Sequence, residues 1–165
     1  MKDVLKNTAR KAGWGKKMPE NHGLGVAIHY SFYSYVATIV EVSVKNERLK
    51  IENIWTTIDC GLALNKDNII NQLEGAAIFG MSIALYGKIS VKEGAVAQHN
   101  FYDYRMTRMK DAPNIHVDII DKMHEAPTGV GEPGVPVMAP AICNAIFNAT
   151  GKRVRSLPIS DLGLV

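Results

Sequence analysis

The sequence predicts an α+β fold in which a mostly antiparallel sheet packs against two or three helices. Three observations predict it: segments rich in β-branched residues follow one another between residues 25 and 58, a long apolar segment of helical character covers 69–86, and an alanine-rich apolar segment covers 135–149. With 165 residues and 47% hydrophobic content, the chain is long enough for one domain with a real core. We therefore expect a single domain over residues 1–165.

The first third of the chain predicts a short helix and then three consecutive antiparallel strands. Apolar residues within 2–12 have helical spacing, and the glycines of Gly13-Trp14-Gly15 are expected to end that helix. The following segments alternate apolar and polar residues, as half-buried strands do. The strands are expected at residues 25–32, 35–44 and 49–58, with a hairpin turn at 45–48.

A helix is expected at about residues 69–86, after N-cap candidates at 65–68. Apolar residues surround nearly its whole circumference, which predicts burial on more than one side. Gly75 and Gly80 each cost about 1 kcal/mol relative to alanine in a helix, so they predict the close approach of another backbone or a ligand.

The rest of the chain predicts a second hairpin, a strand and a last helix closed by Gly151. Pro140 is expected to disturb the first part of that helix. The elements are a hairpin at 88–101 with a turn at Glu93-Gly94, a loop at 102–114, a strand at 115–120, a helix at 135–149 and a tail at 152–165 that forms a strand or an extended arm.

The segment Gly129 to Pro136 holds one carboxylate, Glu132, between glycines and Pro133. Glycines admit backbone conformations closed to other residues and let a bulky ligand approach closely, so Glu132 is a candidate general base. Pro133 would fix φ for the start of the following helix, whose free N–H groups could face an anion. The alternative is a Gly/Pro turn with a solvated glutamate.

Composition and spacing argue against several other classes. The net charge of +3, from 19 basic and 16 acidic residues, is too balanced to predict a nucleic-acid surface. Cys60 and Cys143 have no ligand spacing, and the five histidines have no HExxH pattern, so no metal site formed by protein ligands is predicted. The apolar segment 69–86 is interrupted by Asn71, Gln72 and Glu74, which argues against a membrane span.

Several spaced motifs resemble one family in the correct order. They are Thr57-Ile58-Asp59-Cys60-Gly61 through Asn65, Gln72-Leu73-Glu74-Gly75, Leu85-Tyr86-Gly87, Gly129 to Gly134, and Thr150-Gly151-Lys152-Arg153. Together they resemble the C-terminal part of the molybdopterin-binding subunit of the xanthine dehydrogenase and aldehyde oxidase family. The segments 12–15, 31–37 and 100–105 resemble the branch that contains the isoquinoline 1-oxidoreductase beta subunit and related aldehyde dehydrogenases.

This resemblance implies a molybdenum cofactor-binding domain and a molybdenum hydroxylase that oxidises an aldehyde or an N-heterocycle with water as the oxygen source. It implies that Glu132 is the general base and that Gln72, in the family's Gln-x-Glu-Gly motif, contacts the cofactor through its amide. Gly75 and Gly131 are implied to let the cofactor approach. Without the resemblance, the residues favour the alternative that Gln72 is a satisfied core glutamine that caps neighbouring backbone.

The resemblance also implies partners, because 165 residues supply the base and only one wall of a site. The expected partners are the remainder of the molybdopterin-binding subunit and a small subunit that carries iron–sulfur clusters. The rival hypothesis is a non-catalytic binding or assembly domain that keeps the fold, although the presence of both Glu132 and Gln72 argues against it. Relatives with an export signal would place the enzyme in the periplasm, and expression as this chain alone would place it in the cytoplasm.

Overall fold

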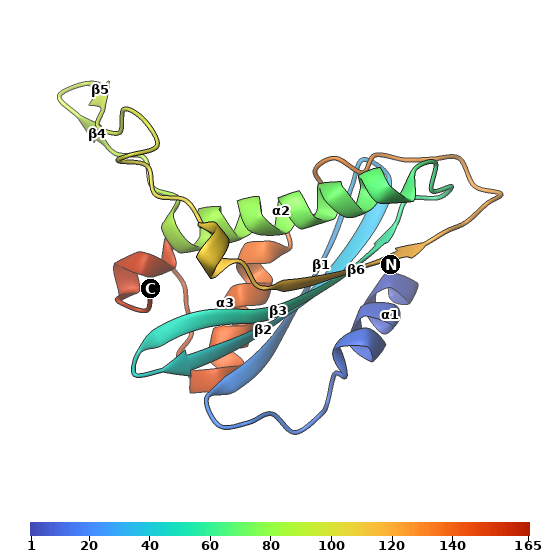
Figure 1. Ribbon diagram of the computed structural model, residues 1–165, viewed down its shortest axis with the longest axis horizontal. Helices are drawn as coiled ribbons and strands as arrows, with labels where there is room; N and C mark the ends of the chain where they lie inside the picture. The colour runs from blue at the N-terminus through green and yellow to red at the C-terminus, as the bar shows by residue number, and fades with distance from the viewer.

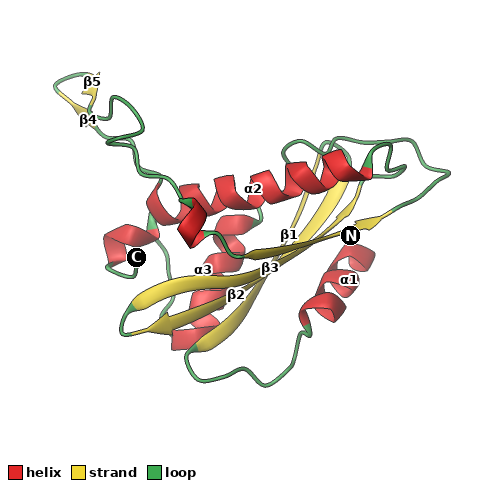
Figure 2. Cartoon of the chain, in the orientation of Figure 1, coloured by secondary structure: helices red, strands yellow, loops and turns green.

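The computed structural model describes all 165 residues and contains a four-stranded sheet with helices on both faces (Figures 1 and 2). The strand order is β1-β2-β3-β6, and the first two pairs are antiparallel. The last pair, β3 with β6, is parallel because the chain crosses over through α2 between them. The strands are β1 His22–Ser31, β2 Ser34–Lys45, β3 Arg48–Asp59 and β6 Asn114–Ile120.

Three helices cover the two faces of the sheet. On one face α1 (Lys2–Ala12) lies against β2 and β3, and on the other face α3 (Met138–Thr150) lies against β1 and β2, with α2 (Lys66–Tyr86) packed on α3 and β6. Neighbouring residues of β2 face opposite sides, so Ile39 joins the cluster under α1 and Val40 joins the cluster under α2 and α3. The predicted mostly antiparallel α+β fold is confirmed.

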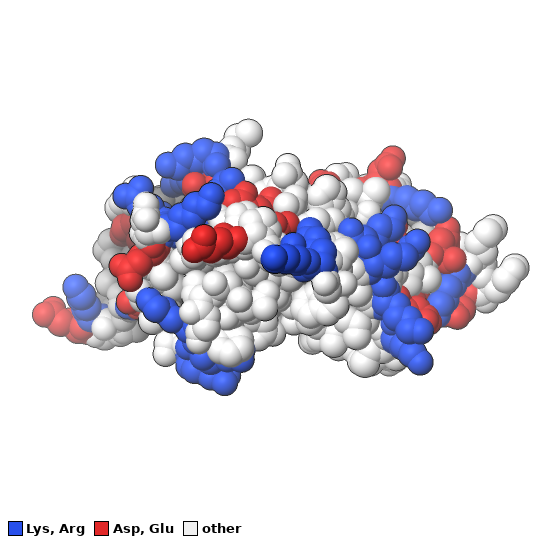
Figure 3. Space-filling view, turned by 90° about the horizontal axis from the view of Figure 1, so that it is seen from below, with Lys and Arg blue, Asp and Glu red and all other residues white.

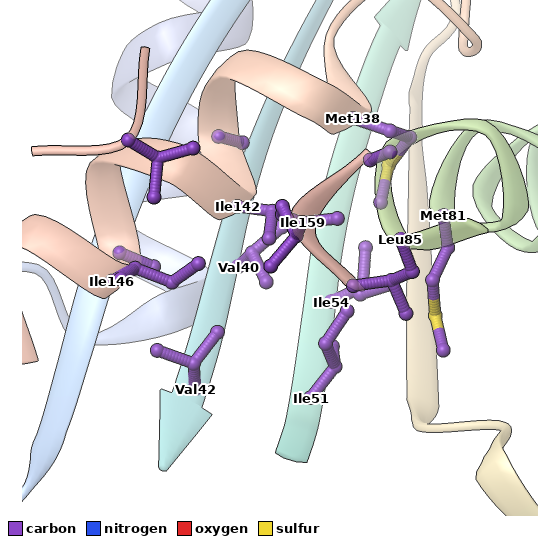
Figure 4. Packing of buried hydrophobic residues seen from close by; sticks show 14 of the residues in the cluster. Val40, Val42, Ile51, Ile54, Met81, Leu85, Met138, Ile142, Ile146 and Ile159 are labelled. Carbon is purple, nitrogen blue, oxygen red and sulfur yellow. The ribbon is translucent and has the colours of Figure 1, made fainter. Parts of the chain in front are cut away.

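The main core lies between the sheet and the pair α2 and α3 (Figure 4). Buried side chains come to this core from strands β2 and β3, from helices α2 and α3, and from the C-terminal tail. The labelled members are Val40 and Val42 of β2, Ile51 and Ile54 of β3, Met81 and Leu85 of α2, Met138, Ile142 and Ile146 of α3, and Ile159 of the tail.

Helix α3 approaches β1 so closely that two glycines are required. A Cβ atom added at Gly25 would lie 2.1 Å from the carbonyl oxygen of Ala141 and 2.1 Å from the backbone nitrogen of Ala145. At Gly23 it would lie 2.4 Å from the carbonyl oxygen of Ala145. The small residues of this interface therefore allow backbone-to-backbone packing of a helix on a strand.

Helix α2 is long and apolar enough to span a membrane by length and composition, with a mean hydropathy of 1.2 over its most apolar window. However, 56% of that window is buried within the chain, and core helices of the same composition pass the same test. Burial on more than one side is confirmed by its contacts with α3 and β6. One strip of the helix remains uncovered, where Phe79 is 53% and Ile83 is 38% exposed.

The structure differs from the sequence-based expectations at the last helix and the tail. Helix α3 begins at Met138 and not at residue 135, so Pro140 lies in its first turn, where its missing N–H disturbs nothing. The tail forms no strand but contains a short 3-10 helix, Ile159–Leu162, and Leu164 accepts a hydrogen bond from the Leu49 N–H at 2.7 Å.

The second hairpin is shorter than expected and stands away from the body of the chain (Figure 1). Its strands are only β4 Val91–Lys92 and β5 Ala95–Val96, followed by a 3-10 turn at Met109–Asp111. The Asp103 carboxylate accepts hydrogen bonds from the backbone N–H groups of Asn100 and His99, which hold its pKa below the ordinary value. The loop is therefore organised by its own hydrogen bonds.

Candidate functional site

The candidate residues lie on two adjoining elements, the loop Gly129–Gly134 and the first half of α2. In Figure 2 the long connection from β6 to α3 passes the N-terminal end of α2 before it reaches α3. Within this connection, Gly134 packs on α2: a Cβ there would lie 2.9 Å from Ala76 Cβ and 2.9 Å from Leu73 Cδ2. Glu132 and Gly131 therefore sit two and three residues from the point at which the loop contacts α2.

The start of this loop is clamped to the β1–β2 hairpin. Ser34 is 0% exposed, and its Oγ donates to the carbonyl oxygen of Gly129 at 2.6 Å and lies 2.7 Å from Thr128 Oγ1. The Gly129 N–H donates to the carbonyl oxygen of Phe32 at 3.0 Å. Because these bonds join segments about a hundred residues apart, they fix the loop relative to the sheet and not merely within itself.

A partly buried ion pair holds the preceding segment to the end of β3. Lys122 Nζ lies 3.0 Å from the Asp59 carboxylate and 3.1 Å from the Glu125 carboxylate. Asp59 is buried, with 6% of its surface exposed. The Asp59 carboxylate, and to a smaller extent the Glu125 carboxylate, raises the pKa of Lys122. The Thr128 N–H completes the attachment by donating to the carbonyl oxygen of Cys60 at 3.0 Å.

The end of the loop is held by apolar packing and a turn. Pro133 and Gly134 are buried, Val137 joins the cluster that contains Leu73, and the Val135 N–H donates to the Glu132 carbonyl oxygen at 3.0 Å. The expectation that Pro133 leads directly into the helix is wrong, since turns occupy the residues before Met138. The glutamate is therefore presented by a turn and not by a helix N-terminus.

Between these two attachments, Gly131 and Glu132 are exposed. A Cβ atom at Gly131 would meet nothing within 4 Å. The Glu132 side chain has no hydrogen-bond or ion-pair partner in the chain, while its backbone is fixed by the turn. A carboxylate held in this way by its backbone alone is available to a group outside the chain.

Gln72 and Gly75 lie on the uncovered strip of α2, next to the residues on which Gly134 packs. Gln72 is exposed and its amide makes no hydrogen bond within the chain, so the alternative of a satisfied core glutamine is wrong. A Cβ at Gly75 would meet nothing within 4 Å, whereas at Gly80 it would lie 2.7 Å from the Met138 side chain. The predicted close approach of another part of the molecule is therefore found at Gly80, where α3 lies against α2, and not at Gly75.

This difference gives a prediction for a pair of matched variants. Gly75→Ala should raise the free energy of unfolding by about 1 kcal/mol through helix propensity, while Gly80→Ala should lower it by about 1–3 kcal/mol by overpacking the α2–α3 contact. Denaturant unfolding followed by circular dichroism measures both. Equal effects of the two substitutions would mean that α2 does not approach α3 more closely at Gly80 than its surroundings approach it at Gly75.

Several other titratable groups have structural partners within the chain. His22 Nδ1 lies 3.3 Å from the Glu41 carboxylate, and His116 stacks on Trp55. Burial, and then the Asp59 carboxylate, raises the pKa of the Cys60 thiol. No group of three metal-ligating side chains is close enough to hold a metal ion. On the face seen in Figure 3, basic side chains lie among acidic ones, without an extended region of one sign.

Sequence reasoning missed the residues that position the loop. Ser34 is a serine without a nucleophile motif, Thr128 is one polar residue before a glycine, and Lys122 is one of many lysines. Their roles arise from contacts between distant segments, and no local pattern records them.

Comparisons with known proteins identify the family of the chain. The family model described as "Molybdopterin cofactor-binding domain" matches residues 4–113, about two thirds of the chain. The chain therefore belongs to the family of molybdopterin cofactor-binding domains.

Among curated proteins, the chain is similar to the beta subunit of the isoquinoline 1-oxidoreductase of Brevundimonas diminuta, with 33% identity over 161 residues that cover 94% of this chain and 20% of the relative. It is 29% identical to a membrane-bound aldehyde dehydrogenase of Gluconacetobacter polyoxogenes, over 94% of this chain and 21% of the relative. It is 30% identical to a subunit of the nicotinate dehydrogenase of Pseudomonas putida, over 96% of this chain and 15% of the relative. The chain thus spans between 15% and 21% of the length of these relatives.

Solved structures have the same fold. A Cu,Mo-containing CO dehydrogenase superposes with a TM-score of 0.66 at 20% identity, over 79% of this chain and 19% of that one. The aldehyde oxidoreductase of Desulfovibrio desulfuricans superposes with a TM-score of 0.64 at 25% identity, over 76% of this chain and 14% of that one.

Proposed function

We propose that this domain forms one wall of the active site of a molybdenum hydroxylase and that Glu132 is its general base. The observation that carries the proposal is the presentation of Glu132: its loop is clamped to the hairpin at Gly129 and to α2 at Gly134, and its carboxylate has no partner within the chain. A base needs a fixed position and a free carboxylate, and this loop provides both.

The residues present fit a large polar cofactor beside α2. The unpaired amide of Gln72 offers one acceptor and two donor positions, and the open space at Gly75 and Gly131 leaves room for a bulky group. The molybdenum cofactor, when bound, supplies the redox chemistry of the oxidation. Gln72 would hold the cofactor through its amide, and Glu132 would accept the proton of the water that supplies the oxygen.

The substrate class that we propose is an aldehyde or an N-heterocycle, because the relatives include enzymes named for isoquinoline, nicotinate and aldehydes. Two of these relatives are named as subunits, which supports assembly with other chains. We propose the remainder of the molybdopterin-binding subunit and an iron–sulfur subunit as partners. The electrons of the oxidation would leave through the clusters of the latter.

Gln72→Ala in the complete enzyme tests the cofactor contact. We expect weaker retention of molybdenum or a several-fold slower turnover with an unchanged fold, because the Gln72 amide makes no hydrogen bond within its own chain and would orient the cofactor without carrying a proton. Lys6→Ala, at an exposed position of α1 on the other face of the sheet, is the control, because the Lys6 side chain likewise makes no hydrogen bond within the chain. Normal turnover together with normal metal content, measured by elemental analysis, would place Gln72 outside the site.

A further inference from the structure

Strand β1 lies at the edge of the sheet. Backbone groups on its outer edge are hydrogen-bonded to other parts of the chain in its first half and not in its second half. Its pairing with β2 ends in a two-residue turn, with Ser31 opposite Ser34, so the backbone groups of the even-numbered residues point away from β2. The outward N–H of His22 donates to the Pro19 carbonyl oxygen at 3.1 Å. The outward groups at Ile28 and Tyr30 receive no hydrogen bond from elsewhere in the chain.

Two asparagines of α3 close the middle of this edge. Asn148 Oδ1 accepts a hydrogen bond from the Leu24 N–H at 2.9 Å, and Asn144 Nδ2 donates to the Val26 carbonyl oxygen at 3.1 Å. Four residues advance a helix by about 6 Å, and two residues advance a strand by about 6.8 Å. Every fourth residue of α3 therefore lies beside every second residue of β1. The next position of the helix row, beside Ile28, is Pro140, which has no side-chain polar group.

The open part of the edge is apolar as well as unpaired. Ile28 is 36% and Tyr30 46% exposed, and the Tyr30 ring lies 4.5 Å from the Tyr35 ring of β2. Phe32 and Tyr33 form the turn with φ of 50° and 63°, a conformation that costs bulky residues about 1–3 kcal/mol each. Proteins ordinarily block exposed edges with charges or prolines, and this stretch of β1 has neither.

We infer that the open edge at Ile28–Tyr30 is a docking site for an extended segment of the remainder of the molybdopterin-binding subunit, which adds a strand to the sheet beside β1. The position of the edge decides the occupant: Phe32, at the end of the same hairpin, bonds to Gly129 of the loop that carries Glu132. A part of the subunit that closes the site over Glu132 would therefore lie close to this hairpin. About four fifths of the length of the relatives lies outside the matched region, which is ample for such a segment.

The inference rests on the proposed function only in placing this chain within a larger subunit. Strand addition would pair the free N–H and C=O groups of both residues, while Ile28 and Tyr30 would pack against alternate side chains of the added strand. The two asparagines would mark where the added strand stops, because the Val26 C=O and the Leu24 N–H already bond to α3.

Residue-resolved hydrogen exchange on the complete wild-type enzyme tests the inference without any substitution. The amides of Ala27 and His29 bond to β2 and serve as the internal control. We expect the amides of Ile28 and Tyr30 to exchange as slowly as these, at least ~10²-fold slower than open amides. Fast exchange at Ile28 and Tyr30 between slowly exchanging neighbours would overturn the inference.

Two further measurements distinguish the proposed segment from a second copy of the chain and test the pairing at Tyr30 directly. Protection that disappears on dilution would indicate pairing with a second copy of the chain and would also overturn the inference. Ile28→Pro removes only an outward N–H and should leave the β1–β2 ladder intact, so it should abolish the protection at Tyr30 while Ala27 stays protected. Loss of activity in Glu132→Gln has no bearing on these exchange rates, so the two proposals can fail separately.

Discussion

Replacement of Glu132 by glutamine in the complete enzyme is expected to lower the rate of substrate oxidation by at least ~10²-fold, with a normal molybdenum content. Glutamine keeps the size of the side chain and its hydrogen-bonding capacity but cannot accept the proton. The turn should survive, because it depends on the Glu132 carbonyl oxygen, which accepts from the Val135 N–H, and on Gly134 against α2. A loss of rate without a loss of cofactor would thus report on the carboxylate alone.

A suitable control is Glu125→Gln in the same connection. Glu125 is also an exposed glutamate, but its carboxylate is already paired with Lys122. We expect the substitution to leave the rate within a few-fold of wild type. The measurement is reduction of the cofactor by substrate in rapid mixing, on protein of known metal occupancy. An undiminished rate in Glu132→Gln would mean that the glutamate only shapes the turn.

Much of the fold could be predicted from sequence, because its elements have local causes. The β-branched alternation of residues 34–59 gives β2 and β3, and Asn65 is the N-cap of α2, accepting from the Asn68 N–H at 3.0 Å. Gly13 ends α1 with φ of 65°, as its position predicts. The parallel pairing of β6 could not be predicted in this way, since it depends on where α2 returns the chain.

The candidate site also has a part that the sequence predicts and a part that it does not. Glu132, Gln72, Gly75 and Gly131 could be named from motifs, and the structure places all four at exposed positions of the loop and of α2, two elements that meet at Gly134. The clamp formed by Ser34 and Thr128 was not predictable, because it joins the hairpin to the loop across about a hundred residues. The start of α3 was misplaced because a glycine- and proline-rich segment can form either a helix end or successive turns.

Gly25→Ala is expected to lower the free energy of unfolding by about 3–5 kcal/mol, a large part of the 5–15 kcal/mol that is typical of a domain. The added methyl group would lie 2.1 Å from the backbone at both Ala141 and Ala145. Neither contact can be relieved by rotating a side chain, so α3 must move away from β1. That movement would also loosen Ile142 and Ile146 from the core.

Gly131→Ala is the matched control for Gly25→Ala, because its added methyl group would meet nothing within 4 Å. Its effect on unfolding should stay within about 0.5 kcal/mol. Denaturant unfolding of both variants measures the difference, and equal stabilities would mean that α3 does not pack on β1 as closely as described. Since α3 follows the Glu132 loop directly, a shift of this helix should also displace Glu132, and under the proposed role of Glu132 the variant Gly25→Ala should slow the complete enzyme even where it remains folded.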